Sequence, residues 1–314
     1  MKTMKKTLSV FLSVLLVFAL LAACGESSPS DSTPGNNSDN SGNPTPGDGG
    51  NDSNTPASSF DASRIIGVFT REEGSGTRDA FTSVTGVGED MYEEAVEKSE
   101  TNEIIAGVEG NDYAIGYVSL GSLNDKIKAL NIGGVAPSSA TVKDGSYPIQ
   151  RPFLVCVNDE KKDDALVQDF ISFILSAEGQ EVAASKWITY VDGAPAYTPS
   201  GLSGTIRVGG STSVDPMMVA LKDKYIAHNP DVKIEISGGG SGTGISEATS
   251  GVIDIGMSSR ALKDSEKEGG LTDYIIALDG VAVIVNTVNP IDGMTMEQVK
   301  DIFTGEVTKW SDVR

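Results

Sequence analysis

Histidine and cysteine are scarce in this chain, and basic residues are outnumbered by acidic ones. The 314 residues include one His and two Cys, with 24 Lys and Arg against 44 Asp and Glu. One His leaves little room for a His-based zinc site or for Ser–His or Cys–His catalysis. Two Cys do not make a disulfide scaffold. The formal net charge of −20 argues against a nucleic-acid binder, because a phosphate backbone has to be neutralised by Lys and Arg.

The first 23 residues are predicted to be a lipoprotein signal peptide. A basic head of three lysines precedes an apolar run over 8–21, which is shorter than the roughly 20 residues that a membrane-spanning helix needs. Leu21-Ala22-Ala23-Cys24 is similar to a bacterial lipobox. We therefore expect a lipid on Cys24 and an extracytoplasmic protein anchored to the cell membrane. An uncleaved membrane anchor is the alternative.

The segment 24–61 is predicted to be a disordered tether. It consists almost entirely of Gly, Ser, Asn, Asp, Pro and Thr, and such a segment buries too little apolar surface to offset the entropy of ordering it. The folded body then begins at residue 62. Cys156 lies in the apolar run 153–157 of this body, which predicts a buried core thiol rather than a nucleophile.

Strand-like and helix-like patterns alternate along the body, which predicts an α/β architecture with mainly parallel sheets. Apolar runs predict strands at 64–69, 114–118, 152–157, 205–208, 232–236, 253–256 and 277–286. Helices are expected at 76–84, 89–100, 164–176, 215–228, from 245 onward, and at 296–303.

Three of the predicted strand-to-helix turns, at 74–77, 210–213 and 238–243, are rich in Gly, Ser and Thr. Such a turn presents backbone N–H groups and hydroxyls at the positive end of a helix dipole, which suits an anion. A capped helix without a ligand explains any one of them equally well. Three in one chain, with Arg71 and Arg78 flanking the first, favour a site for a tetrahedral oxyanion.

None of these turns has the pattern of a nucleotide-binding loop, because G-x-x-x-x-G-K-[ST] is absent and no G-x-G-x-x-G is followed by a suitable acid. The G-x-S-x-G elbow of a hydrolase is absent as well. We therefore expect neither an enzyme nor a metal site, and no cofactor.

Six stretches, which together cover nearly all of residues 64–314, carry a family resemblance. They are 209–216, 237–244, 254–260, 279–286, 303–312 and, most specifically, 71–79. They resemble the PstS family, the phosphate-binding proteins of high-affinity phosphate ABC transporters. The resemblance implies a two-lobed periplasmic-binding-protein fold of type II, with a cleft in which the lobes close over one phosphate. It also implies delivery to a permease in the membrane, and we expect a monomer.

The order of these motifs departs from that of the family. There the Ser-Thr loop comes first, whereas here the stretch 71–79 opens the body and the Lys-Trp-Ser-Asp stretch closes it. We infer a circular permutation, since loop tips tolerate new chain ends. A fragment of a longer or duplicated chain is the alternative. Lobe I is then expected to be contiguous over 152–285, and lobe II to combine 62–151 with 286–314.

Residue by residue, the resemblance implies a set of phosphate contacts. Arg71 supplies a guanidinium fork for a phosphate edge, Glu73 matches a carboxylate that orients it, and Arg78 is a further candidate. Some relatives have an Asp at the position of Ser259, where it accepts the proton of hydrogen phosphate. A hydroxyl can also donate, so Asp279 is the substitute candidate for that role, an exposed acid at a strand edge being the alternative. The implied ligands are Arg71, Ser75, Gly76, Thr77, Thr212, Ser213, Ser241 and Ser259.

Other functions stay open on the sequence. Another oxyanion, such as sulfate, molybdate or an organophosphate, fits the same turns. A structural or adhesive surface lipoprotein with a decayed site is a second alternative. A phosphatase is a third, although the chain lacks a clustered set of metal ligands and an obvious base.

Overall fold

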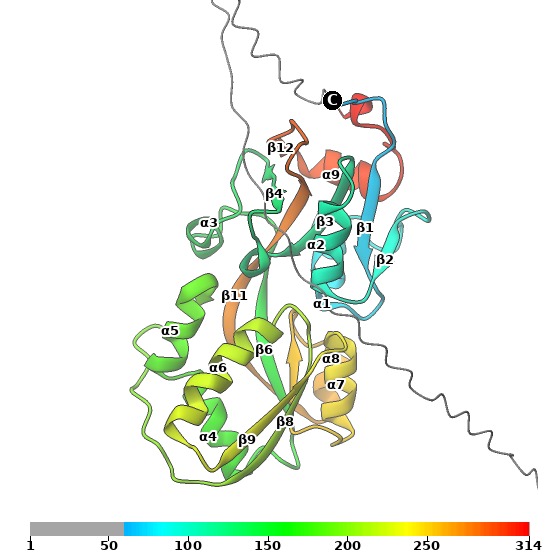
Figure 1. Cartoon of the computed structure of the whole chain (residues 1–314). Coiled ribbons are helices and arrows are strands. Elements are labelled where there is room, and N and C mark those ends of the chain that lie inside the picture. Colours follow the sequence, from blue (N-terminus) through cyan, green and yellow to red (C-terminus); the bar gives the residue numbers. More distant parts are fainter. Residues whose placement is uncertain (1–59, 314) are drawn as a thin grey trace, which may run out of the picture. The chain divides into compact units, whose positions relative to one another are not determined.

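The computed structural model describes residues 60–313, which form two lobes (Figure 1). Each lobe has its own hydrophobic core. The predicted signal peptide, Cys24 and nearly all of the predicted tether lie outside these residues. The core of lobe I consists of apolar side chains between 153 and 277. The core of lobe II consists of side chains between 66 and 149 and between 281 and 310, together with Ile188.

Lobe I is a sheet covered by helices on both faces. Successive residues of its strand β6 (Gln150–Asn158) point to opposite faces, so that Phe153 packs in the core formed with α4, α5 and α6, while Cys156 packs against α7. The prediction of a buried, unpaired Cys156 is thereby confirmed. The other elements of lobe I are α4 (Ala165–Ile174), α5 (Ala177–Lys186), β7 (Ile188–Thr189), β8 (Gly204–Gly210), α6 (Asp215–His228), β9 (Val232–Ser237), α7 (Ser241–Thr249), β10 (Ile255–Ser258) and α8 (Asp264–Glu268).

Lobe II is assembled from two distant pieces of the chain. The piece near the last described residues lies beside the first one, since Ile66 N–H donates to Thr308 O and Ser311 N–H donates to Ala62 O. Helices α1 and α9 contribute to one core of the lobe, and α2 packs in a smaller one with β3. Its elements are β1 (Gly67–Arg71), α1 (Gly76–Thr85), β2 (Val96–Lys98), α2 (Thr101–Glu109), β3 (Ala114–Ser119), η1 (Leu120–Ser122), β4 (Ile127–Ala129), β5 (Asn131–Ile132), α3 (Ser139–Lys143), β12 (Gly293–Met294), α9 (Met296–Phe303) and η2 (Trp310–Asp312).

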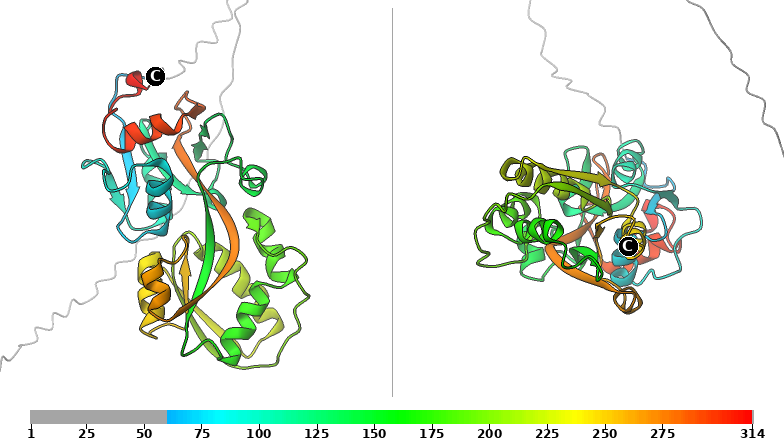
Figure 2. Two further views of the ribbon diagram at one scale, coloured as in Figure 1. Left: turned by 180° about the vertical axis from the view of Figure 1, so that it is seen from behind. Right: turned by 90° about the horizontal axis from the view of Figure 1, so that it is seen from below.

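Two antiparallel strands, β6 and the long β11 (Leu271–Asn286), connect the lobes, as the left view of Figure 2 shows. The first part of β11 pairs with β6, and residues 281–285 pair with β3 of lobe II. The chain therefore returns to lobe II between Ala277 and Val281, and the boundary predicted at 285/286 is several residues too late. The apolar run continues without a break through the crossing, so the sequence pattern does not reveal where the strand changes cores.

The α/β prediction is confirmed, with the strands in the order β2-β1-β3-β11-β6-β10-β8-β9. The outer strands pair in parallel, β1 with β2 and β3, and β8 with β9 and β10. The helix predicted at 89–100 is wrong. That stretch is a loop followed by β2, and the helix α2 begins only at Thr101.

Candidate functional site

Four helices begin at the junction of the two lobes. Three of them, α1, α6 and α7, start at the turns that the sequence predicts. Ser75 is the N-cap of α1, and its hydroxyl accepts a hydrogen bond from the N–H of Arg78. Helix α7 starts after Gly240, whose φ of +86° is a conformation that favours glycine. The fourth helix, α2, was not expected there.

Hydroxyl side chains from these helix ends meet between the lobes. We call Thr77, Thr101, Thr212, Ser213, Ser241 and Ser259 the hydroxyl cluster; all of them except Thr212 are buried. Two side chains of lobe II contact two of lobe I. Thr77 Oγ1 lies 2.9 Å from Ser213 Oγ, and Thr101 Oγ1 lies 3.3 Å from both Thr212 Oγ1 and Ser213 Oγ. These contacts join segments that are more than 100 residues apart in the chain.

Gly76 brings the first turn of α1 against the remaining two hydroxyls of the cluster. Ser241 Oγ and Ser259 Oγ are 3.3 Å apart, and the N–H of Ser259 donates to Ser241 Oγ. A Cβ atom added to Gly76 would lie only 2.4 Å from Ser241 Oγ and 2.8 Å from Ser259 Oγ. The absence of a side chain at this position is therefore what lets α1 approach lobe I so closely.

The guanidinium group of Arg71 is buried beside the cluster and is only 2% exposed. Its Nε and Nη2 form an ion pair with Glu72 and also donate to the carbonyl oxygens of Lys98 and Ser99. Its Nη1 points to the cluster and donates to Thr101 Oγ1 over 3.4 Å. Arg71 therefore has one nitrogen directed toward the hydroxyls.

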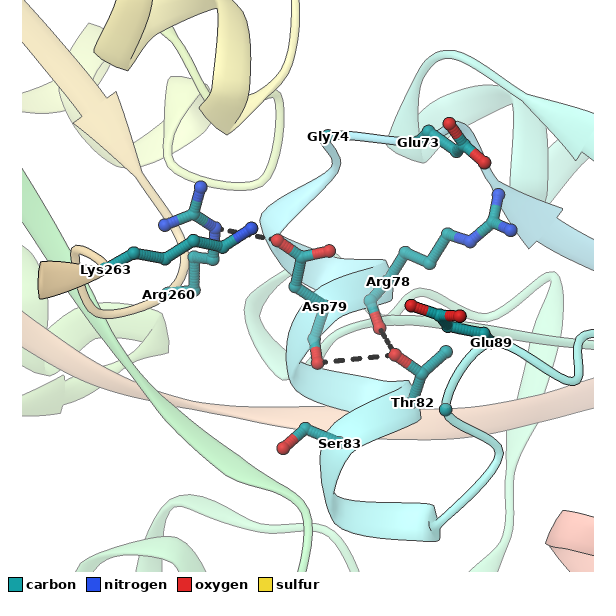
Figure 3. Close-up of a pocket in the computed structure, with 10 residues that line it drawn as sticks. Glu73, Gly74, Arg78, Asp79, Thr82, Ser83, Glu89, Arg260 and Lys263 are labelled. Atoms are coloured by element: carbon teal, nitrogen blue, oxygen red, sulfur yellow. Dashed lines mark hydrogen bonds and ion pairs between the residues drawn. The ribbon is translucent and has the colours of Figure 1, made fainter. Parts of the chain in front are cut away.

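The carboxylate that holds Arg71 is Glu72, not Glu73 as expected. Glu73 is exposed and lines an open cavity on the far side of the turn, with Arg78 (Figure 3). The motif spacing cannot distinguish the two neighbours, because their directions depend on how the turn leaves β1. Arg78 donates to Arg71 O and pairs with Glu97, so its guanidinium supports the end of β1 rather than the cluster.

Asp279 has a different place from the one predicted. It is fully buried on β11 where the strand crosses between the lobes, so it is not an exposed strand-edge acid. Oδ1 accepts from Ser119 Oγ, and Oδ2 accepts from Nε and Nη2 of Arg151 on β6. Burial raises the pKa of Asp279, while Arg151 opposes that shift. The carboxylate thus joins the two connecting strands, and both oxygens are already used.

Thr101 is the cluster residue that the sequence reasoning missed. The sequence contains a signal for this helix start, because Glu103 is suited to capping and the apolar residues Ile104 and Val108 follow at helical spacing. In the structure, Glu103 accepts hydrogen bonds from the N–H groups of Ser99 and Glu100. The predicted helix over 89–100 concealed this start. The N-cap of α6 is Val214, so the Ser213 hydroxyl is not used as a cap and contacts Thr77 in the cluster.

Further contacts hold the lobes together around the cluster. The N–H of Gly242 in α7 donates to Gly74 O over 2.9 Å. Asp79 of α1 forms a 2.8 Å ion pair with Arg260 of lobe I (Figure 3). Arg260 also forms an ion pair with Glu266. Beside the cluster, a cavity of about 160 Å³ is lined from both lobes, with Thr101 on one side and Thr212 on the other. The structure is therefore a closed arrangement of the lobes.

The cavity of about 760 Å³ in Figure 3 is less suited to an anion than the cluster. None of the hydroxyl-cluster residues lines it, and its arginines are already paired with carboxylates. Over residues 60–313, no three His, Cys, Asp or Glu side chains are grouped as metal ligands would be. Within the same range, no helix has the length and apolar character needed to cross a bilayer.

Comparison with known proteins shows the family. A model of the PBP superfamily domain matches residues 52–178 and 195–314. The chain is 43% identical over 267 residues to phosphate-binding protein PstS 2 of Streptococcus pneumoniae serotype 4, which covers 82% of this chain and 91% of that protein. PstS 2 of Streptococcus agalactiae serotype V is 40% identical, with 82% and 90% covered. The chain belongs to the PstS family.

A solved PstS-type structure has the same fold. The crystal structure of a phosphate-binding protein of a phosphate ABC transporter from S. pneumoniae TIGR4 matches with a TM-score of 0.65 and 42% identity, covering 80% of this chain and all of that one. An alignment pairs residues in chain order. The long match to the S. pneumoniae PstS 2 therefore means that the unusual motif order is shared with that member of the PstS family.

Proposed function

We propose that this chain is an extracytoplasmic receptor that binds inorganic phosphate between its lobes and delivers it to the permease of an ABC transporter. The observation that carries the proposal is the hydroxyl cluster, in which side chains from four helix starts and the end of β10 meet next to a buried guanidinium nitrogen. The names of the relatives in the PstS family agree with this ligand.

The cluster has the chemistry that a phosphate needs. Its hydroxyls bond to one another in this closed structure, and each can rotate to donate to a phosphate oxygen instead. Backbone N–H groups at helix starts add partial positive charge without a counter-ion. Arg71 contributes a full positive charge at Nη1, where hydrogen bonds to an anion are stronger than neutral ones. Binding of this kind needs no bond making, so the receptor is not an enzyme.

Ligand binding is coupled to lobe closure because the donors are divided between the lobes. Thr77, Thr101 and Arg71 belong to lobe II, whereas Ser213 and Ser241 belong to lobe I. A phosphate held by both sets gains all of its contacts only in the closed form, and this difference in affinity shifts the population toward it. Strands β6 and β11 provide the connection about which the lobes move.

The preference for phosphate over sulfate rests on neutral groups in this proposal. Glu72 is occupied by Arg71 and Asp279 by Arg151, so we assign the proton of hydrogen phosphate to a hydroxyl such as Ser259. A hydroxyl accepts that proton but can also turn and donate to sulfate. Another oxyanion is therefore the second candidate ligand, and sulfate is the critical comparison.

The remaining parts of the proposal rest on the sequence. The lipobox-like Leu21–Cys24 supports a lipid anchor on Cys24, and the polar segment after it supports a tether to the membrane surface. We also propose that the receptor acts as a monomer, since one chain supplies every group of the cluster.

Calorimetric titration with phosphate, sulfate and a phosphate ester tests the function. We expect tight phosphate binding, and a loss of about 2–5 kcal/mol in Arg71→Ala, the range for removing a buried charge partner. Arg64→Ala, an exposed arginine of the same lobe, is the matched control and should bind normally. Preferred sulfate binding would reassign the ligand, absence of heat with every oxyanion would point to a structural lipoprotein, and turnover of the ester would indicate an enzyme.

A further inference from the structure

We infer that Thr101 is a phosphate-binding residue and that α2 is a fourth helix directed at the anion, in addition to the three that the sequence motifs mark. This inference rests on the proposed function and adds one residue to the proposed phosphate-binding site. Thr101 is the first residue of α2, a helix of nine residues, and is 5% exposed. It lies outside every motif that carried the family resemblance.

The pattern of donors around Arg71 shows where an anion has room to bind. Nη2 donates to Glu72 Oε1 and Ser99 O, which uses both of its hydrogens, and Nε is shared between Glu72 Oε2 and Lys98 O. Nη1 also carries two hydrogens, and its hydrogen bond within residues 60–313 is the long one to Thr101. The corner of the guanidinium that faces Thr101 is therefore the part left for a ligand.

The hydrogen bond from Arg71 also sets the direction of the Thr101 hydroxyl. An arginine can only donate, so Thr101 Oγ1 is the acceptor in this pair and its own hydrogen must point elsewhere. The other neighbours of Oγ1 are the hydroxyls of Thr212 and Ser213, on the opposite lobe, at 3.3 Å. The Thr101 O–H is thus directed into the gap between the lobes, as a donor that the adjacent guanidinium polarises.

The anion is expected among the hydroxyls rather than in the neighbouring cavity. That cavity of about 160 Å³ is lined by Thr101 and Thr212 but also by the acids Glu100 and Asp215, and neither Arg71 nor Ser213 lines it. A tetrahedral oxyanion placed between Arg71 Nη1 and Ser213 would have Thr101 as its nearest hydroxyl from α2. Thr101 would then exchange its contacts with lobe I for a charge-assisted hydrogen bond to a phosphate oxygen.

The test compares Thr101→Val with Thr101→Ser and Thr85→Val. Valine keeps the shape of threonine and removes the hydroxyl, and serine keeps the hydroxyl. Thr85 is a matched control, because it is also buried in lobe II but its hydroxyl bonds within its own helix, to Phe81 O. Titration with inorganic phosphate should show affinity reduced about 10- to 100-fold in Thr101→Val, the range for losing a hydrogen bond to a charged group. Thr101→Ser should stay within a few-fold of the unmodified protein, and Thr85→Val should be unchanged.

A second measurement distinguishes ligand contact from a purely structural role. The ³¹P resonance of phosphate bound at saturation should move in Thr101→Val and not in Thr85→Val, because only the first changes a group that touches the anion. Equal affinity, or an unchanged resonance, in Thr101→Val would overturn the inference while leaving phosphate binding intact. Absence of phosphate binding by the unmodified protein would overturn the proposed function, and the inference with it.

Discussion

Substitution of Gly76 by alanine should weaken phosphate binding by keeping the lobes apart. The added methyl group would lie 2.4 Å from Ser241 Oγ, 2.8 Å from Ser259 Oγ and 3.1 Å from Ser241 Cβ, and real Cβ atoms essentially never come within 3.0 Å of a non-bonded heavy atom. Rotation of the two buried hydroxyls would break their contacts within the cluster and would leave the contact with Ser241 Cβ. Ser241 and Ser259 belong to lobe I and Gly76 to lobe II. The clash therefore exists only when the lobes are closed, and opening them relieves it.

The size of the effect follows from the cost of overpacking. One extra methyl group in a well-packed site costs about 1–3 kcal/mol, which corresponds to a dissociation constant raised about 5- to 150-fold. Because the penalty falls on the closed form, we expect it in the phosphate affinity rather than in the melting temperature of ligand-free protein. Calorimetry gives the affinity. Small-angle scattering at saturating phosphate should show a larger radius of gyration than that of the unmodified protein.

The control for this prediction is Gly110→Ala. Gly110 lies at the end of α2 in the same lobe, in a helical conformation that alanine also adopts, and the nearest atom to its added methyl group is Ala106 O at 3.2 Å. This variant should bind phosphate normally. If Gly76→Ala bound phosphate within twofold of the unmodified protein, the close approach of α1 to lobe I could not be part of the ligand-bound state.

Two further predictions concern the ion pair of Asp79 with Arg260 between the lobes and the buried thiol of Cys156. Asp79→Asn removes the ion pair with Arg260; because Asp79 is one-third exposed, we expect only about 0.5–1 kcal/mol, or a two- to fivefold weaker phosphate affinity. The difference in phosphate affinity between the unmodified protein and Asp79→Asn should shrink in 1 M NaCl, where the Debye length is about 3 Å. An equal difference at low salt and in 1 M NaCl would contradict an electrostatic contribution of this ion pair to lobe closure. Burial raises the pKa of Cys156 to about 12, so almost no thiolate exists at pH 8. In a Cys24→Ser background, a thiol reagent should therefore label Cys156 only at the rate of unfolding, and rapid labelling of native protein would show that the strand β6 is accessible.

The local parts of the site could be predicted because they depend on neighbouring residues. Ser75 can cap α1 and Gly240 can adopt a positive φ wherever the turns lie, so these helix starts were recognisable from short segments. The resemblance to the PstS family then predicts that these turns share one ligand. The start of α2 is equally local, but the sequence pattern predicts a helix over the acidic stretch before it, where the structure has a loop and β2.

Other features depend on contacts that no local pattern records. The choice between Glu72 and Glu73 as the partner of Arg71 depends on the course of the turn after β1. The role of Asp279 depends on Arg151, which is 128 residues away in the chain and becomes its cross-strand neighbour only when β6 and β11 pair. The point where β11 leaves lobe I likewise depends on which core surrounds each apolar residue.

The amino-acid sequence alone predicts the class of ligand, since helix starts rich in Gly, Ser and Thr carry their partial charge and their donors wherever they are placed. Only the tertiary structure decided that four such starts meet, that Thr101 is among them, and that a missing side chain at Gly76 lets the lobes close. The physical reason is that dipoles and caps are properties of a few consecutive residues. Convergence and close approach are properties of surfaces brought together from distant parts of the chain.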